Sequence, residues 1–134
     1  MKTNGIGQVI LRVVLGFIFF MHGLSKFQGG IDNTAGYFES LGLFGFIAYI
    51  VAIIELIGGI ALVLGLGTRI VAALLAVIML GAIFTAKLSA GLLGDGQMPG
   101  YELDLALLAM SIYFVLARRI YLSLDNKFFN RNKS

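Results

Sequence analysis

An apolar stretch with one charge near its centre constrains this chain more than any other feature. The segment from Phe44 to Leu66 contains a single ionisable residue, Glu55. A helix that crosses a bilayer needs roughly 20 mostly apolar residues to cover about 30 Å of hydrocarbon. A carboxylate at that depth is costly unless it faces a partner or a polar cavity. The segment therefore predicts a membrane helix whose carboxylate has a specific counterpart.

The composition extends this prediction to the whole chain. Hydrophobic residues make up 59% of the 134 positions and charged residues only 13%. A soluble domain of this size has too much surface for its volume to bury that apolar content. We predict an all-α membrane protein with one domain over residues 1–134, folded as a four-transmembrane-helix up-down bundle. The spans are approximately 6–23, 44–66, 70–87 and 101–121.

The connections between the spans indicate how they are arranged. The turn over residues 65–69 is so short that the spans on either side must be antiparallel neighbours. The first loop is longer and is expected to hold a short interfacial helix that Asn33 caps. Tyr37, Phe38 and Leu41 would share one face of it, which is typical of a helix lying at the membrane surface.

The basic residues predict the orientation. With four spans, both termini and the 65–69 turn share one side, and most lysines and arginines fall there. By the positive-inside rule both termini are cytoplasmic, in a multi-pass protein of the cell (plasma) membrane. The net charge of +3 then reflects topology and contact with anionic lipid, and nucleic acid is not expected as a partner. The residues on that side are Lys2, Arg69, Arg118, Arg119, Lys127, Arg131 and Lys133, with Arg12 just inside the membrane.

Several kinds of redox chemistry have no ligands in this sequence. The chain has no cysteine and one histidine, so thiol exchange, iron–sulfur ligation and a bis-histidine haem within one subunit are excluded. No phosphate-binding glycine loop lies between a strand and a helix. We expect no covalent cofactor and no metal site, so any electron chemistry would use a diffusible or partner-held group.

Two charged residues are expected deep in the bilayer. Arg12 lies about 9 Å from the cytoplasmic side, and Glu55 about 16 Å from the opposite side, at 1.5 Å per helical residue. One prediction is an Arg12–Glu55 ion pair that lines a polar pocket, because intramembrane ions usually pair. The alternative is that Arg12 extends to the headgroups while Glu55 is protonated and bonded to a neighbouring group.

A second polar group is expected at the outer face. His22 and Lys26 share one side of the first span, Lys87 ends the third, and Glu102 and Asp104 begin the fourth. Together they predict a site for a polar ring such as a quinone, in which His22 and Glu102 are catalytic and move protons. Lysines at the headgroup layer and acids in a first helical turn are the structural alternative. The predicted ligand-binding residues are Arg12, Lys26, Glu55, Lys87 and Asp104.

Several strings of this sequence resemble one family of membrane proteins. The string RVVLGFIFFMHGLSKF, residues 12–27, resembles the first helix of DoxX-family membrane proteins, with its arginine, HG pair and following lysine. The run IELIGGIALVLGLGTRIVA starts at Glu55 and is similar to that family's second helix and turn. YELDLALLAM at 101–110 and SLD at 123–125 match its fourth helix and tail. LARRIY at 116–121 departs from the glycine-rich turn of many members.

The resemblance implies a link to quinones. DoxX-family members are associated with quinone-dependent oxidoreductase systems, including a thiosulfate:quinone oxidoreductase subunit, and with operons that handle catechols, hydroquinones and oxidative stress. Many have no assigned reaction, and the family does not say which residues act. The residues that match by position are Arg12, His22, Lys26, Glu55, Arg69, Glu102 and Asp125.

Three functions stay open from the sequence. The first is a membrane component of a quinone-linked oxidoreductase or detoxification system that binds a quinone-like molecule between its helices. The second is a non-catalytic scaffold that docks a soluble oxidoreductase on its basic cytoplasmic tail. The third, more weakly supported, is a small-solute or proton carrier. The cost of burying Arg12, His22 and Glu55 favours the first.

Overall fold

The chain folds into helices. The computed structural model describes residues 3–96, 100–117 and 120–121, and helices account for most of them. Four are long and one short, and the fourth continues as a single turn of π-helix, η1, and a 3-10 turn, η2. Their bounds are α1 Thr3–Gln28, α2 Ile31–Ser40, α3 Phe46–Leu64, α4 Thr68–Ala82, η1 Ile83–Lys87, η2 Leu88–Ala90 and α5 Glu102–Leu116.

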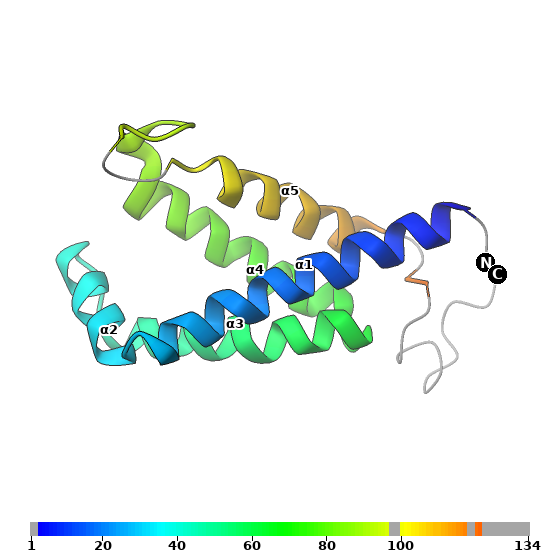
Figure 1. Cartoon of the computed structure of the whole chain (residues 1–134), viewed down its shortest axis with the longest axis horizontal. Helices are drawn as coiled ribbons and strands as arrows, with labels where there is room; N and C mark the ends of the chain where they lie inside the picture. Colours follow the sequence, from blue (N-terminus) through cyan, green and yellow to red (C-terminus); the bar gives the residue numbers. More distant parts are fainter. Residues whose placement is uncertain (1–2, 97–99, 118–119, 122–134) are drawn as a thin grey trace.

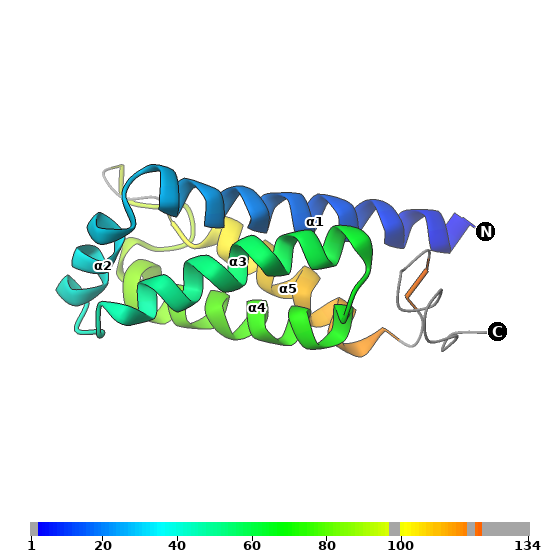
Figure 2. The ribbon, with the colours of Figure 1, turned by 90° about the horizontal axis from the view of Figure 1, so that it is seen from below.

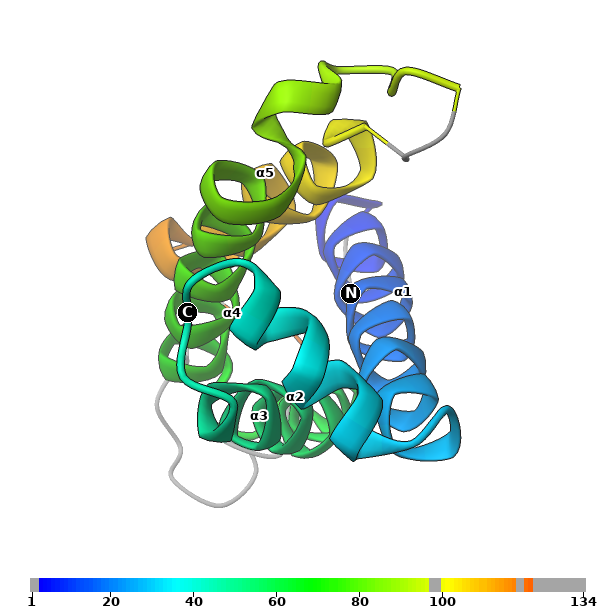
Figure 3. The same ribbon diagram turned by 90° about the vertical axis from the view of Figure 1, so that its left-hand side faces the viewer.

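The four long helices lie side by side along the long axis of the molecule (Figures 1 and 2). α1 packs along α3, α4 packs along α5, and contacts between α3 and α4 join the two pairs. Successive long helices run in opposite directions, so the α1–α2 and η2–α5 connections lie at one end (Figure 1). α2 crosses that end of the bundle (Figure 3). The residues 120–121 lie at the other.

Three helices of the described chain are long and apolar enough to cross a membrane. These segments are Gly5–Gln28, Phe46–Leu64 and Thr68–Thr85. The outward faces agree with this, because large apolar side chains such as Ile57 and Ile70 are 61% and 72% exposed. A lipid environment, unlike water, accepts such a surface. α5 has 15 residues and is not among the three.

The first two helices differ in detail from their predicted bounds. α1 continues to Gln28, past the expected end at Gly23, so Lys26 belongs to the helix. α2 is present in the first loop, but the prediction that Asn33 caps it is wrong. The helix starts at Ile31, and the Asn33 side chain donates instead to the Gly29 carbonyl at 3.1 Å.

A tight turn connects α3 and α4. Gly65 ends α3 with φ 76°, and Gly67 precedes α4 with φ 55°. Both values lie in the left-handed region that residues with a Cβ rarely adopt. The amide of Leu66 returns to the Ala61 carbonyl at 2.8 Å, which closes the last turn of α3. This short connection fixes the two helices as neighbours.

Glycines bring the backbones of α1 and α3 into direct contact. A Cβ atom built on Gly59 would lie 2.5 Å from both the Gly16 carbonyl oxygen and the Phe20 nitrogen. A Cβ on Gly23 would lie 2.5 Å from the Leu56 nitrogen. Small residues let membrane helices approach closely where no hydrophobic drive between helices exists. The close approach sets which residues of α1 face which residues of α3.

We predict that Gly59→Ala destabilises the protein by about 1–3 kcal/mol, the usual cost of overpacking a tight interface. The new methyl group would push α1 away from α3, because backbone atoms cannot rotate aside. The measurement is the thermal unfolding temperature in detergent. Gly7→Ala is the matched control, since a Cβ at Gly7 meets nothing within 4 Å and alanine is the better helix former. Equal effects of the two changes would contradict the contact.

Candidate ligand site at the α2 end of the bundle

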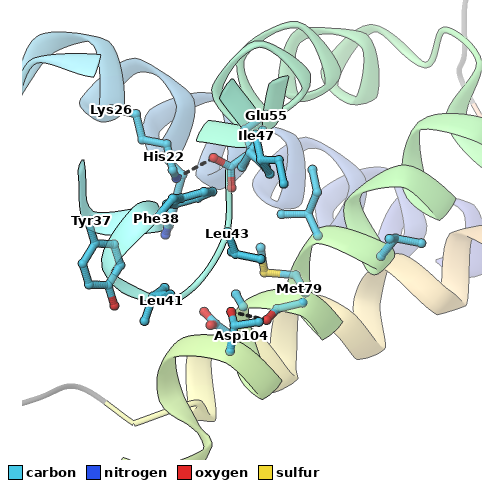
Figure 4. A pocket seen from close by; sticks show the side chains of 16 residues that line it. His22, Lys26, Tyr37, Phe38, Leu41, Leu43, Ile47, Glu55, Met79 and Asp104 are labelled. Carbon is cyan, nitrogen blue, oxygen red and sulfur yellow. Dashed lines mark hydrogen bonds and ion pairs between the residues drawn. The ribbon is translucent and has the colours of Figure 1, made fainter. Parts of the chain in front are cut away.

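A pocket of about 390 Å³ lies between the helices at the end that α2 crosses (Figure 4). This volume falls within the range of small-molecule sites. All five α-helices and η1 contribute to its lining. Its polar residues are His22, Lys26, Glu55, Thr85 and Asp104, and its apolar and aromatic residues include Tyr37, Phe38, Leu41, Leu43, Ile47, Val51, Ile78 and Met79.

An ion pair forms one wall of the pocket. The Lys26 Nζ atom lies 2.6 Å from the Glu55 Oε1 atom. The Glu55 side chain is 2% exposed and the Lys26 side chain 21% exposed, so the carboxylate is the deeply buried partner. A buried charge needs such a partner, because desolvation is otherwise uncompensated. Lys26, for which a place among the headgroups was the structural alternative, is therefore the counter-charge of Glu55.

The register of α1 on α3 explains this pairing. Gly23 faces both Ala52 and Leu56 across the antiparallel contact. His22 is thus level with Glu55, and Lys26 lies one turn farther toward α2. The long lysine side chain reaches back by that one turn to meet the carboxylate.

The predicted Arg12–Glu55 pair is wrong. Arg12 lies ten residues before His22, so it is about 15 Å from the level of Glu55 along the helix axis. An arginine side chain cannot span that distance. Arg12 is 2% exposed and donates through Nη1 to the Tyr121 carbonyl oxygen at 2.5 Å. The side-chain Oε1 atom of Gln8 accepts from the Tyr121 amide at 2.8 Å, so side chains of α1 bind both backbone groups of that residue.

The structure brings Asp104 to the pocket rather than Glu102. Asp104 is 4% exposed and lines the cavity, whereas Glu102 is exposed and lies outside the lining. The two residues lie on opposite sides of α5, as their spacing required. The predicted pairing of His22 with Glu102 in one site is therefore not what the fold produces. The side chain of Lys87 lies outside the described part of the structure.

Polar groups occupy two opposing sides of the pocket. Figure 4 shows Lys26, His22 and Glu55 on one side, Asp104 on the other, and Leu43 and Met79 between them. The first side belongs to α1 and α3, and the second to α5. The middle of the pocket is therefore apolar, and hydrogen-bonding groups lie on both sides of it.

α2 contributes the aromatic part of the lining. Tyr37 and Phe38, which the sequence placed at the membrane surface, line the pocket instead. The hydroxyl of Tyr49 on α3 donates to the Asp32 carboxylate and ties α2 to α3. The sequence showed the apolar face of this helix but not what it covers. Thr85 gave no sequence signal, because a lone threonine at a span end is common.

A metal site is not supported by the described residues. Across residues 3–96, 100–117 and 120–121 no three histidine, aspartate or glutamate side chains gather in a way that could hold an ion. The pocket's polar groups instead consist of one ion pair, one further carboxylate, one imidazole and hydroxyl groups. Such a set suits an organic ligand.

Comparison with known proteins supplies the family. A family model described as DoxX matches residues 7–88, which is more than half of the chain. This protein belongs to the DoxX family. A Bacillus subtilis (strain 168) protein named "Putative oxidoreductase CatD" is 46% identical over 99% of this chain and 95% of its own length. No solved structure matches the chain.

Two more distant relatives carry less informative names. A Haemophilus influenzae "Uncharacterized protein" is 37% identical over 90% of both chains. The Mycobacterium tuberculosis "Uncharacterized membrane protein Rv3486" is 30% identical over 92% of this chain and 82% of its own length. Of these three names, one describes a membrane protein and one an oxidoreductase.

We predict that Lys26 and Glu55 are energetically coupled. Lys26→Met alone should lower the stability by roughly 3 kcal/mol, because it leaves a buried carboxylate without its counter-charge. Lys26→Met combined with Glu55→Gln should cost clearly less than the sum of the single changes. Thermal unfolding of the four proteins in detergent measures this.

The matched comparison is the Arg12→Gln and Glu55→Gln pair. These residues are far apart and do not contact one another, so their effects should add to within about 0.5 kcal/mol. Strict additivity for Lys26 and Glu55, or strong coupling between Arg12 and Glu55, would contradict the observed arrangement.

Proposed function

We propose that this protein is a membrane component of a quinone-linked oxidoreductase or detoxification system, and that it binds a quinone-type ring in the pocket at the α2 end. The observation that carries this is the placement of polar groups on two opposing sides of an otherwise apolar cavity. A quinone-type ring has the matching form: a flat apolar body with one oxygen at each end. The name of the Bacillus subtilis relative supports the assignment to redox chemistry.

The residues of the chain have separate roles in this proposal. Lys26, His22 and Glu55 hold one oxygen of the ring, and Asp104 meets the other. Leu43 and Met79 pack on its body, and α2 shields it from water. Converting a quinone to its hydroquinone takes two electrons and two protons. We propose that the electrons come from a separate redox protein, since the sequence has no cysteine to hold an iron–sulfur cluster and only one histidine for haem.

The membrane arrangement is part of the same proposal. α1, α3, α4 and α5 would all cross the bilayer, with both termini in the cytoplasm. Supporting this, α5 lies parallel to the three apolar helices in the bundle and is free of charges after Asp104. Of the described basic residues, Arg12 and Arg69 both donate to main-chain carbonyls that follow α5, at the end of the bundle opposite α2. The pocket would then lie in the outer half of the membrane.

A reporter fused to the C-terminus tests the orientation. An enzyme that is active only outside the cytoplasm, such as alkaline phosphatase, should stay silent there. The same reporter inserted in the 91–100 loop should be active, because that loop lies at the α2 end. The reverse pattern would overturn the proposed orientation.

Asp104→Asn should weaken ligand binding at least about tenfold, because it replaces the pocket carboxylate by a group with a different hydrogen-bond pattern. The measurement is equilibrium dialysis of the detergent-solubilised protein against 1,4-naphthoquinone and its hydroquinone under anaerobic conditions. Glu102→Gln is the matched control, two residues away, exposed and outside the pocket. It should leave binding unchanged.

The scaffold alternative has its own expected result. If the parent protein binds neither form of the ring above the level of empty micelles, the pocket is not a quinone site. The function of a docking platform for a soluble oxidoreductase would then replace the proposal. If Glu102→Gln and Asp104→Asn weaken binding equally, the ligand does not occupy this pocket.

A further inference from the structure

The ring nitrogens of His22 have defined roles. The Nδ1 atom lies 2.8 Å from the Ile18 carbonyl oxygen. A carbonyl oxygen only accepts hydrogen bonds, so Nδ1 must carry the proton and donate it. In the neutral imidazole the other nitrogen, Nε2, is then an acceptor. The backbone of α1 therefore fixes the tautomer of the neutral ring, in which Nε2 is the hydrogen-bond acceptor.

Thr85 is fixed in the same way by the backbone. Its hydroxyl donates to the Gly81 carbonyl oxygen at 2.6 Å, within the segment where α4 becomes the π-helix η1. The single hydroxyl proton is thus used, and the oxygen offers lone pairs to the pocket. The hydrogen-bond donors of His22 and Thr85 are thus both bound to main-chain carbonyls of their own helices.

The charged groups add to this bias. The pocket holds two carboxylates, Glu55 and Asp104, and one ammonium group, that of Lys26. An ionised carboxylate accepts hydrogen bonds and donates none. Lys26 already directs one of its protons to Glu55 at 2.6 Å. The donors of His22 and Thr85 already bind main-chain carbonyls. Besides Lys26, the lining residue that can donate a hydrogen bond to a ligand is therefore Tyr37, whose hydroxyl can also accept one.

From this inventory we infer that the pocket selects the hydroxyl-bearing, reduced form of a dioxygenated aromatic ring over the quinone form. This rests on the proposed function and names the redox form that its site recognises. A hydroquinone donates two hydrogen bonds and still offers lone pairs to Lys26. A quinone has two carbonyl oxygens and no donor, so it would bring its lone pairs against the lone pairs of His22 and Thr85. Two facing acceptors form no hydrogen bond, whereas a hydroxyl group between them does.

The specificity-determining residue in this inference is His22. Its acceptor nitrogen is enforced by Ile18, and its level on α1 places it beside Glu55. His22→Phe keeps a flat ring of similar size but removes the acceptor. Thr85→Val removes the second acceptor with almost no change in shape. Neither variant alters the Lys26–Glu55 pair.

Three ligands that share one ring system test the inference. They are 1,4-naphthohydroquinone, 1,4-naphthoquinone and 1,4-dimethoxynaphthalene, and the last keeps both oxygens but has no donor. Anaerobic equilibrium dialysis with the purified full chain in detergent, corrected for uptake by empty micelles, gives the three dissociation constants. We expect the hydroquinone to bind at least about tenfold more tightly than either of the others. His22→Phe should reduce that preference about tenfold, and Thr85→Val should reduce it in the same direction.

The outcomes separate this inference from the proposed function. If quinone binds as tightly as hydroquinone, the selectivity is wrong while the quinone-type site stands. If the dimethoxy compound has the same dissociation constant as the hydroquinone, shape alone determines binding and the inference is wrong.

A cation is a further possible ligand. If an aromatic ammonium, 1-naphthylmethylammonium, binds more tightly than the hydroquinone, the acceptors bind a cation instead. If His22→Phe and Thr85→Val both keep the parent preference, these acceptors do not set it. Binding of none of the ring compounds would overturn the proposed function itself.

Discussion

The carboxylate of Glu55 sits among apolar helices, and the need to compensate that charge organises one whole end of the bundle. Its partner Lys26 can reach it because glycines at positions 16, 23 and 59 let the backbones of α1 and α3 touch. With larger residues the helices would stand apart, and a lysine one turn away would no longer meet the carboxylate. The contact between the α1 and α3 backbones therefore determines that Lys26 meets Glu55. Because of this ion pair, the α2 end of the bundle is too polar to be filled by apolar side chains alone. A cavity with charged walls follows from that sequence of causes.

The two ends of the bundle use their polar residues differently. At the end opposite α2, side chains of α1 and α4 form hydrogen bonds with the backbone that follows α5. Gln8 and Arg12 bind the amide and carbonyl of Tyr121, and Arg69 donates twice to the Ala117 carbonyl, at 2.6 and 3.0 Å. At the α2 end, the polar side chains face a cavity. Orphan backbone groups at helix ends must find partners inside a membrane protein. The first set meets that structural need, while the second set lines the pocket.

Much of the helical layout could be predicted from the sequence, because long apolar runs leave few choices. The residues that line the pocket are harder to predict from the sequence, and each wrong prediction about them has a physical cause. The depths of Arg12 and Glu55 were counted from the ends of apolar runs, but the glycine contacts set the register and bring Lys26 to Glu55 instead. The spacing of Glu102 and Asp104 showed that only one of them faces inward, yet the spacing alone does not say which. The aromatic face of α2 was visible in the sequence, but whether it meets lipid or a cavity depends on where the loop folds. His22 and Lys26 were found because polar residues within an apolar run are rare.

The position of the pocket also bears on how the chain would work with a partner. Tyr121 lies at the end of the bundle opposite α2, where its carbonyl accepts from Arg12. α3 alone, with 19 residues, spans about 28 Å between the two ends. Glu55 lies nine residues, about 14 Å, before the end of α3 on the Tyr121 side. A soluble oxidoreductase that docked there would therefore be separated from the nearest pocket residues by about half the thickness of the hydrocarbon core. It could not touch a ring held between Glu55 and Asp104. Electrons would have to travel with a ligand that leaves the pocket, or a partner would have to approach from the α2 side. The proposed binding in the pocket and the alternative of docking at the tail therefore concern different parts of the molecule, and evidence for one would not be evidence for the other.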